Sequence, residues 1–353
     1  MNKDISLDLQ SQIIDAKNSK TALKIQAGNS KHFYARHIEA QLLDVSEHQG
    51  IINYEPSELV ITARAGTPLK DIESLLSEHN QMLAFEPPSF ADTATLGGTI
   101  ACNFSGPRRA YRGAARDYVL GSKIINGKGE ILSFGGEVMK NVAGYDASRL
   151  MCGALGTLGL ILETSLKVVP KAEAELTLVQ QCTTAQAIEK MNHWAQKSIP
   201  VSGSFFDGEN LYIRLSSNQP SVTSASKTIG GETLNDDGLF WQQLKEHQLD
   251  FFDTNEPVWR LSLAPNTDEL HLQGETLYEW GGALRWLVTD EPVDKIRHAA
   301  EVAGGHATIF HNAPSHLEPF HELNKGLFSI SKNLKDAFDP EYILNPCRMY
   351  ANL

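Results

Sequence analysis

Glycine-rich segments are the part of this sequence whose residue types and spacing point most directly to chemistry. Three of them read Thr-Ala-Thr-Leu-Gly-Gly-Thr-Ile-Ala-Cys-Asn at 93–103, Lys-Asn-Val-Ala-Gly-Tyr-Asp at 140–146 and Gly-Ala-Leu-Gly-Thr-Leu-Gly at 153–159, and a fourth candidate lies at 27–31. Glycine lets the backbone approach a ligand closely and turn with positive φ, so that consecutive N–H groups can converge on an anion. The set predicts a long, phosphate-bearing cofactor held between several loops.

Two common nucleotide-binding patterns are absent from the sequence. A nicotinamide-binding Rossmann unit needs Gly-x-Gly-x-x-Gly between a strand and a helix, and a P-loop ATPase needs Gly-x-x-x-x-Gly-Lys-Ser/Thr. Neither string occurs, and the glycines of 153–159 lead into a predicted strand. The sequence therefore favours a different cofactor-binding fold.

Together, the glycine-rich segments resemble the FAD-binding domain of the vanillyl-alcohol oxidase/PCMH flavoprotein family. The resemblance covers residues 1–170 and extends to Phe-Asp-Pro at 338–340 and Asn-Pro at 345–346, and Lys-Asn-x-x-Gly-Tyr-Asp is its most specific part. It implies an α+β fold that begins with a PCMH-type FAD-binding domain of two α/β subdomains. A ferredoxin-like α+β cap domain would follow.

The expected domain limits follow from this resemblance and from a change of composition after Pro170. The FAD-binding domain is placed at 1–172, the cap at 173–335, and a tail that returns to the FAD domain at 336–353. Beyond Pro170, two strand–helix–strand units predict a ferredoxin-like sheet with helices on one face. The segment 219–232, rich in Ser, Thr and Gly, is expected to be a loop or a frayed helix.

The elements that position the glycine loops are predicted from periodicity and turn residues. A strand at 23–27 runs into the first glycine turn, and a helix at 69–80 is expected to have Thr67 as its N-cap. Asn-Gly-Lys-Gly at 126–129 predicts a β-hairpin over 118–134.

The resemblance also implies which residues bind FAD. In the family, the first loop and the Thr-x-Gly-Gly loop hold the pyrophosphate, and the other two segments flank the isoalloxazine ring and the adenosine end. Some relatives attach flavin to a residue near the first loop, but His32 and His37 do not stand at the position expected for a linked histidine, so non-covalent FAD is predicted. The implied FAD-binding residues are Gly28, Asn29, Ser30, Lys31, Pro88, Thr95, Gly97, Gly98, Thr99, Asn103, Gly144, Asp146, Gly153, Gly156, Gly159 and Ile161.

The sequence departs from the family pattern at two positions. Ala27 stands in the first loop, where relatives usually have a further glycine. Cys347 follows Asn-Pro where relatives usually have glycine. The local turn at Cys347 is therefore left open.

Arginine and histidine residues outside the glycine loops are candidates for substrate chemistry. Arg109 belongs to a tight basic cluster at 108–116, where its guanidinium could hold a carboxylate or a phosphate, or could lie on a solvated turn. His306 and His311 flank a predicted strand and could act as acid or base at a flavin edge. Histidines recur every five residues over 306–321, a spacing that fits neither a helix face nor a strand face, so no metal site is expected.

Composition argues against several other classes of protein. The chain has 353 residues, 41% hydrophobic and 21% charged, and a formal net charge of -12, which argues against a nucleic-acid partner. Its four cysteines form no Cys-x-x-Cys pair, which argues against an iron–sulfur cluster in this chain and favours a reducing cytoplasm. The N-terminus is not typical of a signal peptide and no apolar run is long enough to span a membrane, so attachment to the inner membrane would be through a partner.

The resemblance implies an FAD-dependent oxidoreductase, namely the FAD-binding subunit of a glycolate oxidase (glycolate dehydrogenase) complex. In this interpretation a larger FAD-containing catalytic subunit oxidises glycolate, a small 2-hydroxy acid, to glyoxylate, and an iron–sulfur subunit passes electrons to quinone. The His-rich Gly-Asp-Gly-Asn segment of such catalytic subunits is absent here. Two alternatives remain open: a self-sufficient FAD-dependent 2-hydroxy acid dehydrogenase that uses the arginines of 108–116 and a cap histidine, and a structural subunit with a degenerate flavin fold.

Overall fold

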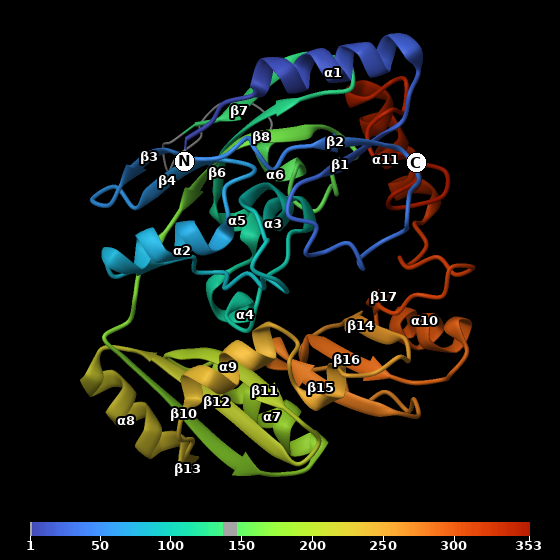
Figure 1. Cartoon of the computed structure of the whole chain (residues 1–353). Helices are drawn as coiled ribbons and strands as arrows, with labels where there is room; N and C mark the ends of the chain where they lie inside the picture. Colours follow the sequence, from blue (N-terminus) through green and yellow to red (C-terminus); the bar gives the residue numbers. More distant parts are fainter. Residues whose placement is uncertain (1, 137–146) are drawn as a thin grey trace. The chain divides into compact units, whose positions relative to one another are not determined.

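The computed structural model describes residues 2–136 and 147–353, and the chain forms two compact units (Figure 1). The first unit consists of Met1–Phe104, Ala114–Pro170 and Glu322–Leu353, and the second consists of Ser105–Gly113 and Lys171–His321. The Lys-Asn-Val-Ala-Gly-Tyr-Asp segment at 140–146, with Gly144 and Asp146, lies outside the described residues.

The limits of these units differ in detail from the domain limits expected from the sequence. The long segment of the second unit begins at Lys171, beside the expected start of the cap at 173, and it ends at His321 instead of at 335. In addition, residues 105–113 join the second unit. The arginine cluster that follows the Thr-x-Gly-Gly loop is thus divided between the two units.

The first unit is built around an antiparallel sheet. In its described part, five strands lie in the order β3-β4-β8-β6-β7. Their bounds are β3 Ile51–Glu55, β4 Val60–Arg64, β6 Val119–Ile125, β7 Ile131–Gly135 and β8 Leu160–Lys167. Two smaller pairs accompany this sheet: β1 (Leu23–Gln26) is parallel to β2 (Gln41–Asp44), and β5 (Gln81–Met82) is antiparallel to β9 (Val169–Pro170).

Helices bury apolar stripes against the sheet of the first unit. Leu9 and Ile13 of α1 and Ile72 and Leu76 of α2 have i, i+4 spacing, and all four are fully buried in one hydrophobic core. The helices of this unit are α1 Ser6–Ser19, α2 Leu69–Glu78, α3 Leu96–Cys102, α5 Ala115–Tyr118, α6 Ala147–Leu150 and α11 Lys325–Phe338.

The β6–β7 hairpin is confirmed, and the start of α2 differs from its prediction. At the hairpin, the Asn126 side-chain oxygen accepts the backbone N–H groups of residues 128 and 130 at 3.0 and 2.9 Å. At α2, Pro68 takes the N-cap position instead of Thr67. The Thr67 hydroxyl accepts the N–H of Gly50 at 2.9 Å and donates to its carbonyl at 3.3 Å, so it holds the preceding loop and does not cap the helix.

The second unit contains one antiparallel sheet, whose described strands lie in the order β13-β10-β12-β11-β15-β16-β14-β17. The strands are β10 Ala174–Gln181, β11 Val201–Phe206, β12 Asn210–Ser217, β13 Glu232–Thr233, β14 Val258–Ser262, β15 Glu275–Glu279, β16 Leu284–Val288 and β17 His306–His311. The helices are α4 Arg109–Arg112, α7 Thr184–Ala195, α8 Gln219–Ile229, α9 Asp237–Lys245 and α10 Val293–Val302, with short 3₁₀ turns at Asp250–Phe252 and Trp280–Gly282.

The strand order shows two ferredoxin-like halves joined edge to edge. The first half, β10-α7-β11-β12-α8-β13, has its fourth strand beside its first and its third between first and second, which is a ferredoxin-like arrangement. The second half, β14 to β17, has the same strand order, with α10 as its helix and a non-helical connection between β14 and β15. The halves meet where β11 pairs with β15. The predicted ferredoxin-like cap is confirmed in this form.

Two helices of the second unit depart from the sequence expectations. The segment expected to be a loop or a frayed helix contains α8, because the Asn218 side chain caps it by accepting the N–H of Ser221 at 2.9 Å. α9 lies on the sheet face opposite to α7: Trp241 donates to the hydroxyl of Thr177 at 2.8 Å, while Leu178 points into the core that contains α7. Within the described ranges, no helix is both long enough and apolar enough to cross a membrane.

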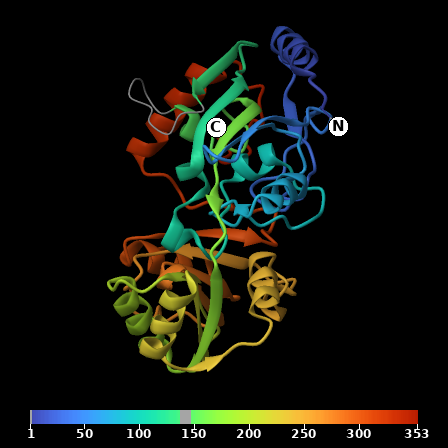
Figure 2. The ribbon, with the colours of Figure 1, turned by 90° about the vertical axis from the view of Figure 1, so that its left-hand side faces the viewer.

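A buried ion pair holds α11 and the C-terminal segment onto the first unit. Lys335 Nζ lies 2.7 Å from Asp339 Oδ2, and both side chains are almost completely buried. Lys335 also donates to the carbonyls of Thr157 at 2.8 Å and Leu344 at 2.9 Å. In both views, α11 and the tail (red) lie beside the green strands of the five-stranded sheet (Figure 1 and Figure 2), and the Gly127 N–H donates to Phe338 O at 2.9 Å.

Replacing Lys335 is expected to destabilise the first unit strongly. Lys335→Met leaves the Asp339 carboxylate buried without its cation, which costs about 3–5 kcal/mol of unfolding free energy. Urea denaturation followed by circular dichroism measures this loss. Lys332→Met on the same helix is the control, since Lys332 pairs with Asp336 on the exposed side and its loss should change the urea midpoint little. Equal losses in the two variants would contradict the structural role of the buried pair.

Cys347 adopts the left-handed conformation that favours glycine. Its φ is +58°, in a region that glycine adopts without the steric cost that a side chain brings. The Cys347 N–H donates to the Leu353 carbonyl at 2.7 Å, and its thiol contacts the Ala351 carbonyl at 3.2 Å. The side chain thus occupies a strained position and makes only a weak polar contact.

Cys347→Gly is expected to raise the unfolding free energy by about 0.5–1 kcal/mol, because relief of the left-handed strain exceeds the extra chain entropy of glycine. Thermal denaturation of the purified chain measures the change. Cys347→Ser is the control, since it removes the thiol and keeps the strain, and it should give no gain. A gain of the same size with serine would show that the thiol, and not the backbone, is the cause.

Candidate functional site

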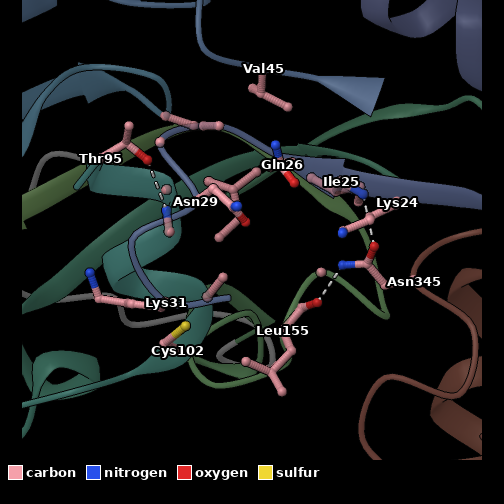
Figure 3. Close-up of a pocket in the computed structure, with 18 of the residues that line it drawn as sticks. Lys24, Ile25, Gln26, Asn29, Lys31, Val45, Thr95, Cys102, Leu155 and Asn345 are labelled. Atoms are coloured by element: carbon pink, nitrogen blue, oxygen red, sulfur yellow. Dashed lines mark hydrogen bonds between the residues drawn. The ribbon is translucent and has the colours of Figure 1, made fainter. Parts of the chain in front are cut away.

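The first unit contains a cavity of about 390 Å³ whose walls come mainly from four parts of the chain (Figure 3). These are β1 with the loop at 27–32, the first turns of α3, residues 155–161 at the start of β8, and Asn345 with Arg348 from the C-terminal segment. The first three of these contain glycine-rich segments that the sequence singled out. The size is typical of a small-molecule or cofactor site.

The first loop approaches its neighbour so closely that only glycine fits at its centre. A Cβ atom on Gly28 would lie 1.4 Å from the Thr93 carbonyl oxygen. The Thr93 hydroxyl donates to the Gly28 carbonyl at 2.6 Å and fixes this approach. Asn29 then turns the chain with φ +55°. The loop is therefore a backbone-lined cradle next to β1.

The beginning of α3 forms the second wall. Thr95 caps the helix by accepting the N–H of Gly98 at 3.3 Å. A Cβ atom on Gly97 would lie 2.6 Å from the Cβ of Ala65, so glycine lets the helix pack directly against the end of β4. Backbone N–H groups at a helix start carry partial positive charge and favour an anion.

The third wall is the glycine turn before β8. Leu155 and Gly156 have φ of +51° and +71°, and the Leu155 N–H donates to the Ala101 carbonyl of α3 at 3.0 Å. The Gly153 N–H likewise donates to the Ile100 carbonyl at 3.1 Å. This turn is thus attached to the end of α3, and the two walls keep a fixed spacing.

The electrostatic character of the cavity is cationic. Lys24, Lys31 and Arg348 line it, and no aspartate or glutamate occurs among the described lining residues. Lys31 is 8% exposed, and its ammonium group lies 3.3 Å from the Ser89 carbonyl. Burial raises the pKa of the Cys102 thiol, with Lys31 and Arg348 acting in the opposite direction, so this cavity thiol is neutral at pH 7. The site therefore suits an anionic ligand.

Most of the residues implied to bind FAD are brought together at this cavity. Those that line it are Gly28, Asn29, Ser30, Lys31, Thr95, Gly97, Gly98, Gly156, Gly159 and Ile161. Pro88, Thr99, Asn103 and Gly153 are not among its lining residues. Thr99 donates to the Thr95 carbonyl at 2.9 Å inside α3, and the Asn103 side chain accepts the N–H of Arg116 at 3.2 Å. Contact of these residues with the cofactor stays a prediction.

Sequence reasoning missed part of the cavity wall. Asn345 and Arg348 line it, although the sequence marked Asn345 only as part of a family match in the tail. Cys102, Val45 and Ala65 also line it, from α3 and from the segments after β2 and β4. An asparagine before proline was the only local signal, and it carries no information about which cavity the side chain reaches.

The three catalytic candidates lie in the second unit. The Arg109 guanidinium lies 4.3 Å from the ring centre of Trp280, which itself donates to the Gly106 carbonyl at 3.0 Å. His306 begins β17 and is exposed, and burial lowers the pKa of His311 to about 4. A histidine with such a pKa is a poor match for a general base at neutral pH. No metal-holding group of three or more His, Cys, Asp or Glu side chains occurs within residues 2–136 and 147–353.

Comparison with known proteins gives a consistent result. A family described as "FAD binding domain" matches residues 6–135. The glycolate oxidase subunit GlcE of Escherichia coli K12 is 46% identical over 350 residues, which are 99% of both chains. The glycolate oxidase subunit GlcD of Bacillus subtilis is 34% identical over 166 residues, 46% of this chain and 35% of that protein. A solved alkyldihydroxyacetonephosphate synthase covers 96% of this chain and 75% of its own at a TM-score of 0.68, with 15% identity, which shows a shared fold.

Gly28→Ala is expected to weaken FAD binding by about fivefold or more, because moving the loop away from Thr93 to make room for the added Cβ costs on the order of 1–3 kcal/mol in the FAD-bound form. Titration of the FAD-free chain with FAD, followed by quenching of flavin fluorescence, measures the dissociation constant. Gly238→Ala is the control: it lies in α9 of the second unit, and its Cβ would meet nothing within 4 Å. Unchanged FAD affinity in Gly28→Ala would show that the first loop is not part of the cofactor site.

Proposed function

This chain belongs to the family of FAD-binding glycolate oxidase subunits that includes GlcE, and from this membership we propose that it is the FAD-binding subunit of a glycolate-oxidising complex. The observation that carries the proposal is the match over 99% of both chains, together with a glycine-lined cationic cavity in the unit that the FAD-binding family matches. FAD is bound without a covalent link in this proposal.

The residues of the cavity fit FAD in shape and charge. At Gly28 and Gly97 a Cβ atom would overlap a neighbour, so the backbone itself forms the surface there, as close approach to a pyrophosphate requires. Lys31 and the cationic lining oppose the pyrophosphate charge. Apolar side chains, among them Ile25 and Val45, line the same cavity and suit the flat ring systems of the cofactor.

The chain's own contribution in this proposal is binding, orientation and electrostatics. Bound FAD supplies an isoalloxazine ring that accepts two electrons as hydride and releases them singly. The loop at 27–31 and the start of α3 hold the pyrophosphate, and the turn at 153–159 fixes the other side of the cofactor. Lys31, almost fully buried, keeps a positive charge beside the phosphates.

We further propose that the chain works with partner subunits. A relative named as a subunit implies an assembly, and the partners proposed here are a larger FAD-containing catalytic subunit and an iron–sulfur subunit that leads electrons to quinone. The four cysteines of this chain, all among the described residues, are free, and the sequence holds no Cys-x-x-Cys pair. A separate iron–sulfur protein would therefore carry single electrons onward. The proposed location is the cytoplasm, with any membrane attachment made by a partner.

Oxidation of glycolate is proposed to take place on the larger partner subunit. His311, one of the two histidines considered as a base in this chain, has its pKa lowered to about 4 by burial. The Arg109 guanidinium is stacked on Trp280. These features give the self-sufficient dehydrogenase less support than the subunit interpretation.

The purified chain supplied with FAD is expected to show flavin absorption that stays oxidised when glycolate is added without oxygen. Addition of the larger partner subunit should then allow glycolate to reduce the flavins. Bleaching by glycolate with the isolated chain, lost in His306→Ala or His311→Ala, would instead establish the self-sufficient dehydrogenase. A folded chain that binds no FAD but still binds its partners would establish the structural subunit.

A further inference from the structure

We infer that Asn345 is a positioning residue of the cofactor cavity: its side-chain amide holds two cavity walls at a fixed spacing and thereby sets the affinity for FAD. This inference rests on the proposed FAD site. Figure 3 shows the amide between Ile25 on one side and Leu155 on the other, with both hydrogen bonds drawn.

The C-terminal segment first pairs with β1 through its backbone. The Leu23 N–H donates to the Ile343 carbonyl at 2.7 Å, and the Asn345 N–H donates to the Leu23 carbonyl at 2.9 Å. At Asn345 the backbone turns away with φ +41°, and Pro346 follows without an N–H group. The next β1 donor, the Ile25 N–H, is taken by the Asn345 Oδ1 at 2.8 Å. The Asn345 side chain therefore extends the hydrogen bonding between the C-terminal segment and β1 by one more bond.

The other end of the same amide reaches the turn before β8. Asn345 Nδ2 donates to the Leu155 carbonyl at 2.7 Å. This joins β1, which leads into the first glycine loop, to a segment that is also tied to α3 through Leu155 and Ala101. An amide is needed because one position must accept and the other must donate, and Asn345 is only 6% exposed. Its removal would leave the Ile25 N–H and the Leu155 carbonyl without this partner, at a cavity that both residues line.

The Asn345 amide, which bridges Ile25 and Leu155, lies at the cavity itself. Ile25, Leu155 and Asn345 all line it. The neighbouring Gly156, at φ +71°, makes room for the amide, because a Cβ there would lie 2.8 Å from Asn345 Nδ2. A ligand bound between several loops depends on their spacing, and supporting hydrogen bonds that fix this spacing raise its affinity.

The C-terminal segment is held in place independently of the amide. Asp339 accepts the N–H groups of Ile343 at 3.1 Å and Leu344 at 2.8 Å, and Lys335 donates to the Leu344 carbonyl. Arg348 donates to the Tyr34 carbonyl at 2.6 Å, just after the first loop. Loss of the amide should therefore release the cavity walls from each other and leave the segment attached. This separates a positioning role from a purely structural one.

Asn345→Ala is expected to raise the dissociation constant for FAD by about tenfold or more, measured by fluorescence titration of the FAD-free chain. Its Tm without FAD should fall by no more than that of Ile72→Val. The valine variant is the matched stability control, because Ile72 is fully buried in α2 and does not line the cavity. It should lower Tm by about 2–4 °C and leave the FAD dissociation constant within about twofold. Asn352→Ala, an exposed asparagine of the same tail, should change neither.

Asn345→Asp tests the same bridge with an almost unchanged shape. Its carboxylate can still accept the Ile25 N–H but faces the Leu155 carbonyl with an acceptor, so FAD affinity should fall as in the alanine variant. The visible circular dichroism of bound flavin at saturating FAD should change in both Asn345 variants and stay unchanged in Ile72→Val. Should the alanine variant fail to fold, the aspartate variant carries the test.

The outcomes separate this inference from the function on which it rests. An unmodified chain that binds FAD, with Asn345 variants that bind it within about twofold, would overturn the positioning role alone. Equal affinity losses in Asn345→Ala and Ile72→Val at equal loss of Tm would also overturn it. An unmodified chain that binds no FAD would overturn the proposed function itself.

Discussion

The buried ion pair between Lys335 and Asp339 is the interaction on which the C-terminal wall of the cofactor cavity depends. Lys335 reaches the carbonyls of Thr157 and Leu344, and Asp339 accepts the N–H groups of Ile343 and Leu344. Two charges placed away from water are costly unless each is fully hydrogen-bonded, and here backbone groups complete both sets. The pair therefore permits one arrangement of the helix, the tail and the turn before β8. That arrangement sets the shape of the cavity on its C-terminal side.

The charge of the cavity lining is opposite in sign to the net charge of the whole chain. The formal net charge is -12, yet the described cavity lining contains lysine and arginine and no carboxylate. An acidic surface keeps a protein in solution, and a local cationic cavity still attracts an anion because fields at short range dominate over distant, screened charges. Burial of Lys31 strengthens this effect by limiting screening.

The second unit joins two related halves into one wide sheet and leaves one face of it without α7 and α10. On that face, Arg260 of β14 and Trp286 of β16 alternate along their strands with residues of a hydrophobic core, and Trp241 of α9 donates to Thr177 of β10. Arg109 stacks on Trp280 within the same unit. His311 belongs to this unit as well, and burial lowers its pKa to about 4.

The sequence by itself determined the glycine loops, the hairpin at 126–129 and the ferredoxin-like units, because these depend on local turn chemistry and periodicity. It left the segment of α8 open between a loop and a frayed helix, although the Asn218 cap is a local signal that favours the helix. Only the tertiary structure decided that 105–113 belongs to the second unit and that Asn345 completes the cavity. The bonds of Asn345 join residues separated by 320 and 190 positions, and no local pattern encodes contacts that exist only after the chain has closed on itself.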